Sequence, residues 1–208
     1  DGFSQPYENS IFIGGIFYSI IGLWFLIKVL RHFFDSKITI IATGVIIFAT
    51  NYLVHITMYG QNAMSQNYLF TAYTLILWLT IKWHKNHQFK DALFLGIILG
   101  VTILSRPTEI VSLAIPLLWG IDSKSSLANK ISVILMEYKQ VITLGLIVGL
   151  FGTFQFAYWK IYSGNFLFNS YGANAGEGLD LMSPHTFNFL FSFRKGWLVF
   201  TPIAVIAI

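Results

Sequence analysis

The chain has 208 residues, of which 55% are hydrophobic and only 11% are charged. Soluble domains usually carry about twice that charged fraction, so this chain cannot cover its surface with polar groups and its solvent must be membrane lipid. The absence of cysteine excludes a disulfide framework, a thiolate metal site and a thiol nucleophile. The net charge of +4 is modest and does not indicate a nucleic-acid partner.

Apolar segments follow one another along the whole chain, separated by short charged or polar stretches. They predict an all-α polytopic membrane protein of about six to seven transmembrane or half-span helices, forming a single transmembrane domain over residues 1–208. We expect spans at about 10–30, 38–58, 67–83, 91–105, 108–121, 140–161 and 196–208, and a loop at about 162–189. The chain opens at Asp1 without a signal-peptide pattern and stops inside an apolar run, which predicts an internal fragment of a longer protein.

The cations between these spans alternate between two sides. One side carries Lys28, Arg31, Lys37, Lys82, Lys85, Lys90, Lys124, Lys130 and Lys139. The other side carries only Arg106, Lys160, Arg194 and Lys195. By the positive-inside rule the first side is cytoplasmic, which predicts that the 162–189 loop lies on the extracytoplasmic side.

Arg194 and Lys195 are adjacent cations at the start of the last predicted span, on the predicted outer face. Charge in or near hydrocarbon is costly and is usually retained for a task. The pair could neutralise an anionic group bound at the outer leaflet, or it could snorkel to ordinary lipid phosphate. The surrounding aromatic residues indicate an interfacial position in either case.

Arg106 lies at a break between two predicted helices, directly before Pro107. A guanidinium group in that position could bind a phosphate or a carboxylate through two parallel hydrogen bonds. The alternative is a local turn in which Arg106 pairs with Glu109 near the start of the next helix. The sequence leaves both interpretations open.

Other polar residues gather on the predicted outer side. The 162–189 loop contains Tyr171, Glu177 and His185, which an ordinary solvated loop would also explain. Asn51 and His55 lie one helical turn apart in the second predicted span, a spacing typical of interhelical hydrogen bonds. His55 has no ligand partner four residues on, so no metal site is predicted.

Two small-xxx-small patterns, Gly96–Gly100 and Gly145–Gly149, predict places where helices approach closely.

Five segments resemble one family when they are taken in order: residues 1–7 (DGFSQPY), 31–34 (RHFF), 63–68 (AMSQNY), 96–108 (GIILGVTILSRPT) and 190–197 (LFSFRKGW). Together they resemble bacterial glycosyltransferases of the GT-C type, the branch like dolichyl-phosphate-mannose–protein mannosyltransferases and aminoarabinose transferases. The resemblance covers nearly the whole chain. It implies a GT-C transmembrane bundle and an inverting enzyme of the bacterial cytoplasmic (inner) membrane. Such an enzyme takes its sugar from a polyprenyl-phosphate-linked donor at the outer face of that membrane.

The resemblance also implies roles for particular residues. The catalytic carboxylate of such enzymes follows the first span, which would place it upstream of Asp1. Arg106, Arg194 and Lys195 would hold the departing phosphate, where charge grows in the transition state. Relatives commonly have histidine where this chain has Gln66, and glutamine cannot carry a proton near neutral pH.

The expected contacts to the acceptor or the sugar are Gln66, Tyr171, Glu177 and His185. No cofactor is indicated, and although a divalent metal is compatible with this chemistry, no residues here support one. The expected partners are the polyprenyl-phosphate sugar and membrane lipid.

Two other classes of protein stay open. A lipid or solute transporter would show an inverted repeat and ionisable residues near mid-span, and neither is evident. A non-catalytic membrane subunit of a larger assembly is also compatible with the aromatic-rich composition.

Overall fold

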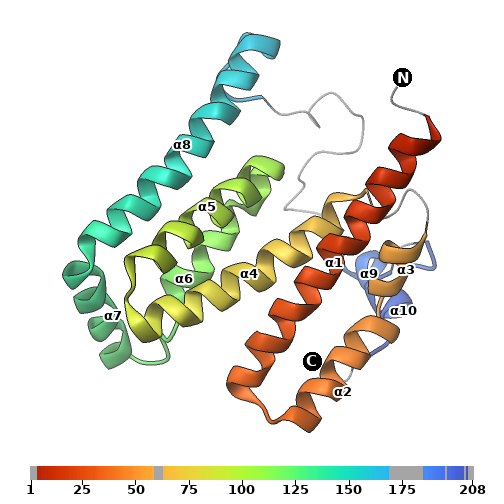
Figure 1. Cartoon of the computed structure of the whole chain (residues 1–208), viewed down its shortest axis with the longest axis horizontal. Coiled ribbons are helices and arrows are strands. Elements are labelled where there is room, and N and C mark those ends of the chain that lie inside the picture. Colours follow the sequence, from red (N-terminus) through yellow and green to blue (C-terminus); the bar gives the residue numbers. More distant parts are fainter. Residues whose placement is uncertain (1–3, 59–62, 169–184, 195, 204, 206–208) are drawn as a thin grey trace.

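The structure is a computed structural model that describes residues 4–58, 63–168, 185–194, 196–203 and 205. Every regular element among these residues is a helix, which confirms the all-α prediction (Figure 1). The helices are α1 (Gln5–Phe33), α2 (Ser36–Phe48), α3 (Tyr52–Thr57), α4 (Ser65–Asn86), α5 (Phe89–Ser105), the 3₁₀ helix η1 (Pro107–Leu113), α6 (Ala114–Leu118), α7 (Lys124–Met136), α8 (Tyr138–Ser163), α9 (Thr186–Phe191) and α10 (Trp197–Phe200).

Two of the described helices, α1 and α8, are long and apolar enough to cross a membrane by themselves. Helix α4 has 22 residues, but it carries buried polar side chains such as Asn67 and Thr71 along its length. Residues 36–48 and 107–118 form shorter apolar helices. The expected six to seven spans are therefore not confirmed, and the spans beyond α1 and α8 stay a prediction.

Helix α4 lies between α1 and α5, and α8 packs on the other side of α5 (Figure 1). The buried core joins α4 to α5 through Ile76, Leu79, Leu95 and Leu99. These four side chains are at most 8% exposed, and Val148 of α8 packs against them. Burial of apolar side chains therefore holds together the three central helices of the bundle.

The two glycine patterns have different surroundings. A Cβ on Gly96 would lie 3.2 Å from the Leu144 Cα atom, and one on Gly100 would overlap the Phe151 ring. The first pattern therefore allows α5 to approach α8 closely, as predicted. A Cβ on Gly145 or Gly149 would meet no described atom within 4 Å, so the prediction for the second pattern is wrong within the described residues.

The segment 38–58, predicted as one span, contains two helices. Helix α2 ends at Phe48 and α3 begins at Tyr52. The Thr50 hydroxyl donates to the Ile46 carbonyl at 2.5 Å and accepts from the Tyr52 amide at 3.1 Å. Threonine hydroxyls compete with helical backbone bonds in this way, and the chain turns here.

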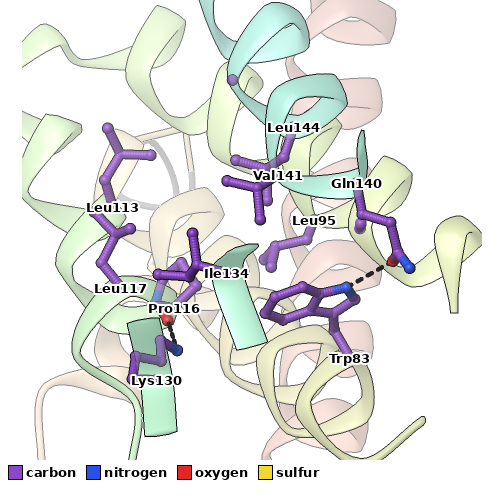
Figure 2. A pocket seen from close by; sticks show the side chains of 12 residues that line it. Trp83, Leu95, Leu113, Pro116, Leu117, Lys130, Ile134, Gln140, Val141 and Leu144 are labelled. Atoms are coloured by element: carbon purple, nitrogen blue, oxygen red, sulfur yellow. Dashed lines mark hydrogen bonds between the residues drawn. The ribbon is translucent and has the colours of Figure 1, made fainter. Parts of the chain in front are cut away.

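One end of the bundle collects the lysines of the first predicted side, and we call it the lysine-rich end. Lys82 of α4 pairs with Asp91 of α5 at 2.8 Å. Trp83 donates its indole N–H to the Gln140 side chain of α8 at 2.8 Å, and Lys130 of α7 donates to the Pro116 carbonyl at 2.7 Å (Figure 2). These bonds join α4 to both α5 and α8, and α7 to α6, at this end.

We predict that replacing Gly96 and Gly100 with leucine will push α8 away from α5. Overpacking of this kind costs about 1–3 kcal/mol at each site. The thermal unfolding midpoint of the full-length protein in detergent should fall clearly. The matched control replaces Gly145 and Gly149 with leucine, where the added side chains meet open space. Equal shifts for the two double variants would contradict the packing described for α5 and α8.

Candidate functional site

The end of the bundle opposite the lysine-rich end contains a buried hydrogen-bonded group between α1, α3 and α4. The Ser19 hydroxyl donates to the Asn67 Oδ1 atom at 2.6 Å, and Asn67 donates through Nδ2 to the Gly15 carbonyl at 3.1 Å. The Tyr52 hydroxyl donates to the Ser19 carbonyl at 2.9 Å. Buried polar groups that are paired in this way fix the relative positions of the helices that carry them.

Asn67 also lines a cavity of about 350 Å³.

The 350 Å³ cavity, which we call the α3–α10 cavity, is bordered by residues of α2, α3, α4 and α10. Its polar lining includes Asn51, His55 and Gln66, and its aromatic lining includes Trp197. The Nδ1 atom of His55 is buried and has no hydrogen-bond partner among the described residues.

The α3–α10 cavity brings together residues that are far apart in the sequence. Gln66, an expected sugar or acceptor contact, lies in the first turn of α4 and lines this cavity. Trp197 begins α10 and is 43% exposed. Arg194 precedes Trp197 by three residues, and its side chain is exposed. The exposed guanidinium group is therefore carried by the segment that borders the cavity.

A second cavity, of about 560 Å³, lies on the other side of the start of α4, and we call it the α1–α5 cavity. Tyr18 of α1, Ser65 and Tyr68 of α4, and Ser105 of α5 contribute to its lining. The rings of Tyr18 and Tyr68 meet edge to face with their centroids 5.0 Å apart. The lining combines hydroxyl groups with aromatic and aliphatic side chains, so this cavity suits an amphipathic ligand.

Arg106 follows Ser105 at the edge of the α1–α5 cavity. Its Nε atom lies 3.8 Å from the Glu109 Oε1 atom, and the Tyr73 hydroxyl donates to Glu109 Oε2 at 2.5 Å. The local pairing of Arg106 with Glu109 is thus present. The Arg106 side chain is nevertheless 44% exposed, and a half-exposed pair at this distance contributes little stability. Donors of the guanidinium group stay accessible.

The predicted phosphate ligands do not meet in one place among the described residues. Arg106 directly follows Ser105, which lines the α1–α5 cavity, whereas Arg194 lies three residues before Trp197, which lines the α3–α10 cavity. The first turns of α4 contribute side chains to both cavities. Lys195 lies outside the described residues.

The structure describes one of the three predicted sugar or acceptor contacts in the 162–189 loop. Tyr171 and Glu177 lie outside the described residues. His185 is exposed and precedes α9, which packs against α10. The Phe189 ring of α9 lies 6.4 Å from the Trp197 ring, measured between centroids. His185 therefore belongs to the same C-terminal segment as the wall of the α3–α10 cavity.

No group of three or more His, Cys, Asp or Glu side chains among the described residues could hold a metal ion.

Some residues near the two cavities have contacts that the sequence analysis missed. Tyr73 donates to Glu109 across 36 positions of sequence, and no local pattern marks such a pair. Asn51 and His55 were expected to bond between helices, but both line the α3–α10 cavity. The spacing of Asn51 and His55 predicts a shared face, and it cannot distinguish a packed neighbour from a cavity.

These observations define a class of protein: an all-helical membrane protein with polar and aromatic cavities at one end of its bundle. A comparison with family models then matches residues 3–159 to dolichyl-phosphate-mannose-protein mannosyltransferases. The chain belongs to this family, which confirms the resemblance found in the sequence and indicates a membrane glycosyltransferase. No curated protein and no solved structure matches the chain. The matched residues include Arg106 and Gln66, whereas Arg194 lies beyond them.

We predict that Tyr73→Phe will destabilise the protein, because it removes the donor from the largely buried Glu109 carboxylate. Loss of a hydrogen bond to a charged group costs about 1.5–3 kcal/mol. Thermal unfolding in detergent should detect this loss. Tyr158→Phe is the control, since the Tyr158 side chain is 56% exposed on α8. An unfolding midpoint as high for Tyr73→Phe as for the control would show that the Tyr73–Glu109 bond contributes no stability.

Proposed function

We propose that this protein transfers a sugar from a polyprenyl-phosphate-linked donor to an acceptor at the outer face of the bacterial cytoplasmic membrane. Membership of the mannosyltransferase family supports sugar transfer. The observation that carries the finer proposal is the α3–α10 cavity, where Gln66, His55 and Trp197 border one space and the exposed Arg194 precedes Trp197 by three residues. The excess of cations at the opposite end supports an outer location for this cavity.

The α3–α10 cavity has the chemistry expected of a sugar site. Its volume of about 350 Å³ lies at the lower end of the range for small-molecule pockets, about 300–1,000 Å³. The amides of Asn51 and Gln66 can each donate and accept hydrogen bonds with sugar hydroxyls. The unpartnered Nδ1 atom of His55 supplies a further polar contact, and Trp197 offers an apolar ring face.

Arg194 and Lys195 would bind the donor phosphate beside this cavity. In the transfer the nucleophilic atom of the acceptor forms a bond to the sugar C1 atom and gives its proton to the catalytic base. The bond between C1 and the phosphate oxygen breaks, and the polyprenyl phosphate leaves with that electron pair. The leaving group is a phosphate monoester, with a charge of about −1.5 to −2 at pH 7. Fixed cations stabilise this growing charge more than they stabilise the bound donor, and they therefore accelerate the transfer.

Arg106 would act at a distance from Arg194, at the edge of the α1–α5 cavity. Its exposed donors could bind a phosphate or carboxylate on a ligand in that cavity, while Glu109 holds the guanidinium group loosely. In this proposal the catalytic base lies upstream of Asp1, and the contacts with sugar or acceptor include Tyr171, Glu177 and His185.

We predict that replacing both Arg194 and Lys195 with alanine will lower the rate of transfer about a hundredfold or more. Each hydrogen bond to a charged group contributes about 1.5–3 kcal/mol, and here the contribution is larger in the transition state. Single-turnover transfer from a polyprenyl-phosphate sugar, with the purified full-length protein in nanodiscs, measures this rate. Arg31→Ala at the lysine-rich end is the matched control. Unchanged transfer by the double variant would contradict the role of this pair in phosphate binding.

We predict that Gln66→Ala and His55→Ala will raise the KM for the donor by about tenfold each, because each removes a polar contact with the bound sugar. The kcat should change less, since neither residue is assigned to the reacting bond. His32→Ala, in the last turn of α1 at the other end, should leave both constants unchanged. A fall in kcat at constant KM would contradict the role of this cavity in sugar binding.

A further inference from the structure

Helix α7 is held against the bundle by one of its faces. Lys130 is only 7% exposed, donates through Nζ to the Pro116 carbonyl, and contacts the His84 Nε2 atom. Ile134, one turn further along, lines an apolar cavity of about 230 Å³ together with Trp83 (Figure 2). These contacts fix the rotation of α7 about its own axis, with Lys130 and Ile134 facing the bundle.

The remaining surface of α7 is amphipathic. Leu127, Ile131 and Leu135 follow at intervals of four residues, so they share a face, and they are 45%, 51% and 67% exposed. The rest of the exposed surface is largely polar and includes Ser125, Asn129 and Ser132. Helix α7 therefore presents one face to the bundle, one apolar face outward and one polar face outward.

The apolar outward face continues from α7 into α8. Exposed apolar side chains follow along α8 at Ile142, Leu146, Leu150 and Phe154, again at intervals of four residues. Helix α8 is one of the two described helices that are long and apolar enough to cross a membrane. Only Glu137 separates α7 from α8, so lipid that surrounds α8 also reaches the exposed apolar side chains of α7.

The charge at this end favours an anionic surface. The loops and helix ends of the lysine-rich end carry nine Lys or Arg residues against four acidic residues, Asp35, Asp91, Asp122 and Glu137. One of the acids, Asp91, is already paired with Lys82. Lys124 is exposed at the first position of α7, and Lys139 is exposed in the first turn of α8, three residues after α7 ends. Such lysines attract anionic lipid headgroups.

We propose that α7 is an interfacial helix that binds anionic phospholipid. Its Leu127–Ile131–Leu135 face enters the acyl region, its serine and asparagine face remains in water, and Lys124 and Lys139 bind lipid phosphate. The inward bonds of Lys130 hold the helix at a constant depth. This interaction is separate from sugar transfer, because it involves the end of the bundle opposite the two polar cavities.

Spin labels at single cysteines test the depth of α7, and the described sequence offers a background free of native cysteine. Leu127→Cys and Ile131→Cys are compared with Ser125→Cys and Asn129→Cys in the full-length protein in nanodiscs. We expect the first two labels to relax with oxygen and to be protected from a nickel chelate. The second pair should show the opposite preference.

Two results would overturn the interfacial position. Access of the nickel chelate to all four labels would mean that α7 projects into water. Protection of the Leu127 and Ile131 labels from both oxygen and nickel would mean that protein, rather than lipid, covers the apolar face.

The choice of lipid is tested by adding phosphatidylglycerol to phosphatidylcholine nanodiscs and following the mobility of the label at Ile131→Cys. Each lysine near an anionic surface contributes about 1 kcal/mol, so Lys124→Gln and Lys139→Gln should each weaken the apparent affinity about fivefold. Lys160→Gln, in the last turn of α8, is the matched control and should change nothing. An affinity that is unchanged by the α7 variants, or reduced equally by the control, would overturn the binding of anionic lipid.

Discussion

The arrangement of this bundle depends on the hydrogen bonds and the ion pair that helix α4 makes with its neighbours near both of its ends. At one end Asn67 bonds with Ser19 and Gly15 of α1. At the other end Lys82 pairs with Asp91 of α5, and Trp83 donates to Gln140 of α8. In a low-dielectric surrounding an unpaired polar group is costly, so these bonds fix how far α4 can slide past its neighbours.

This fixed register determines where the two polar cavities lie. The apolar middle of α4 packs through Ile76 and Leu79, which supply burial but little directional preference. The hydrogen bonds near the first turn of α4 are directional, and they hold Gln66 and Asn67 toward one cavity and Ser65 and Tyr68 toward the other. Helix α4 separates two cavities, and it is held in place by bonds of Asn67, which itself borders the α3–α10 cavity.

The sequence predicts the class of fold well because composition and charge are properties of whole segments. The segment expected at 10–30 corresponds to α1, and the polar stretch before residue 67 precedes α4. The turn at Thr50 was not predicted, because one hydroxyl group competes there with a backbone that is otherwise apolar and helical. The two glycine patterns look alike in sequence, and only the positions of neighbouring helices distinguish them.

The roles of the predicted site residues stay predictions, although the structure describes the positions of several of them. Gln66 borders the α3–α10 cavity, and the exposed Arg194 lies three residues before Trp197, which lines the same cavity. The sequence could not predict that the segments carrying Arg106 and Arg194 border different cavities. This depends on the side of α4 against which each segment packs. The contributions of His55 and Trp197 to one wall depend on the same packing, and they are encoded by segments more than a hundred positions apart.

The lengths of α1 and α8 have a consequence for the surrounding bilayer. With 29 and 26 residues, they extend about 43 Å and 39 Å, whereas the hydrocarbon layer is about 30 Å thick. Each helix must therefore tilt, project beyond the hydrocarbon or thicken the lipid around it. Because α8 packs closely against α5 at Gly96 and Gly100, such an adjustment of α8 would involve α5 as well, so the two helices would have to fit the bilayer as one pair.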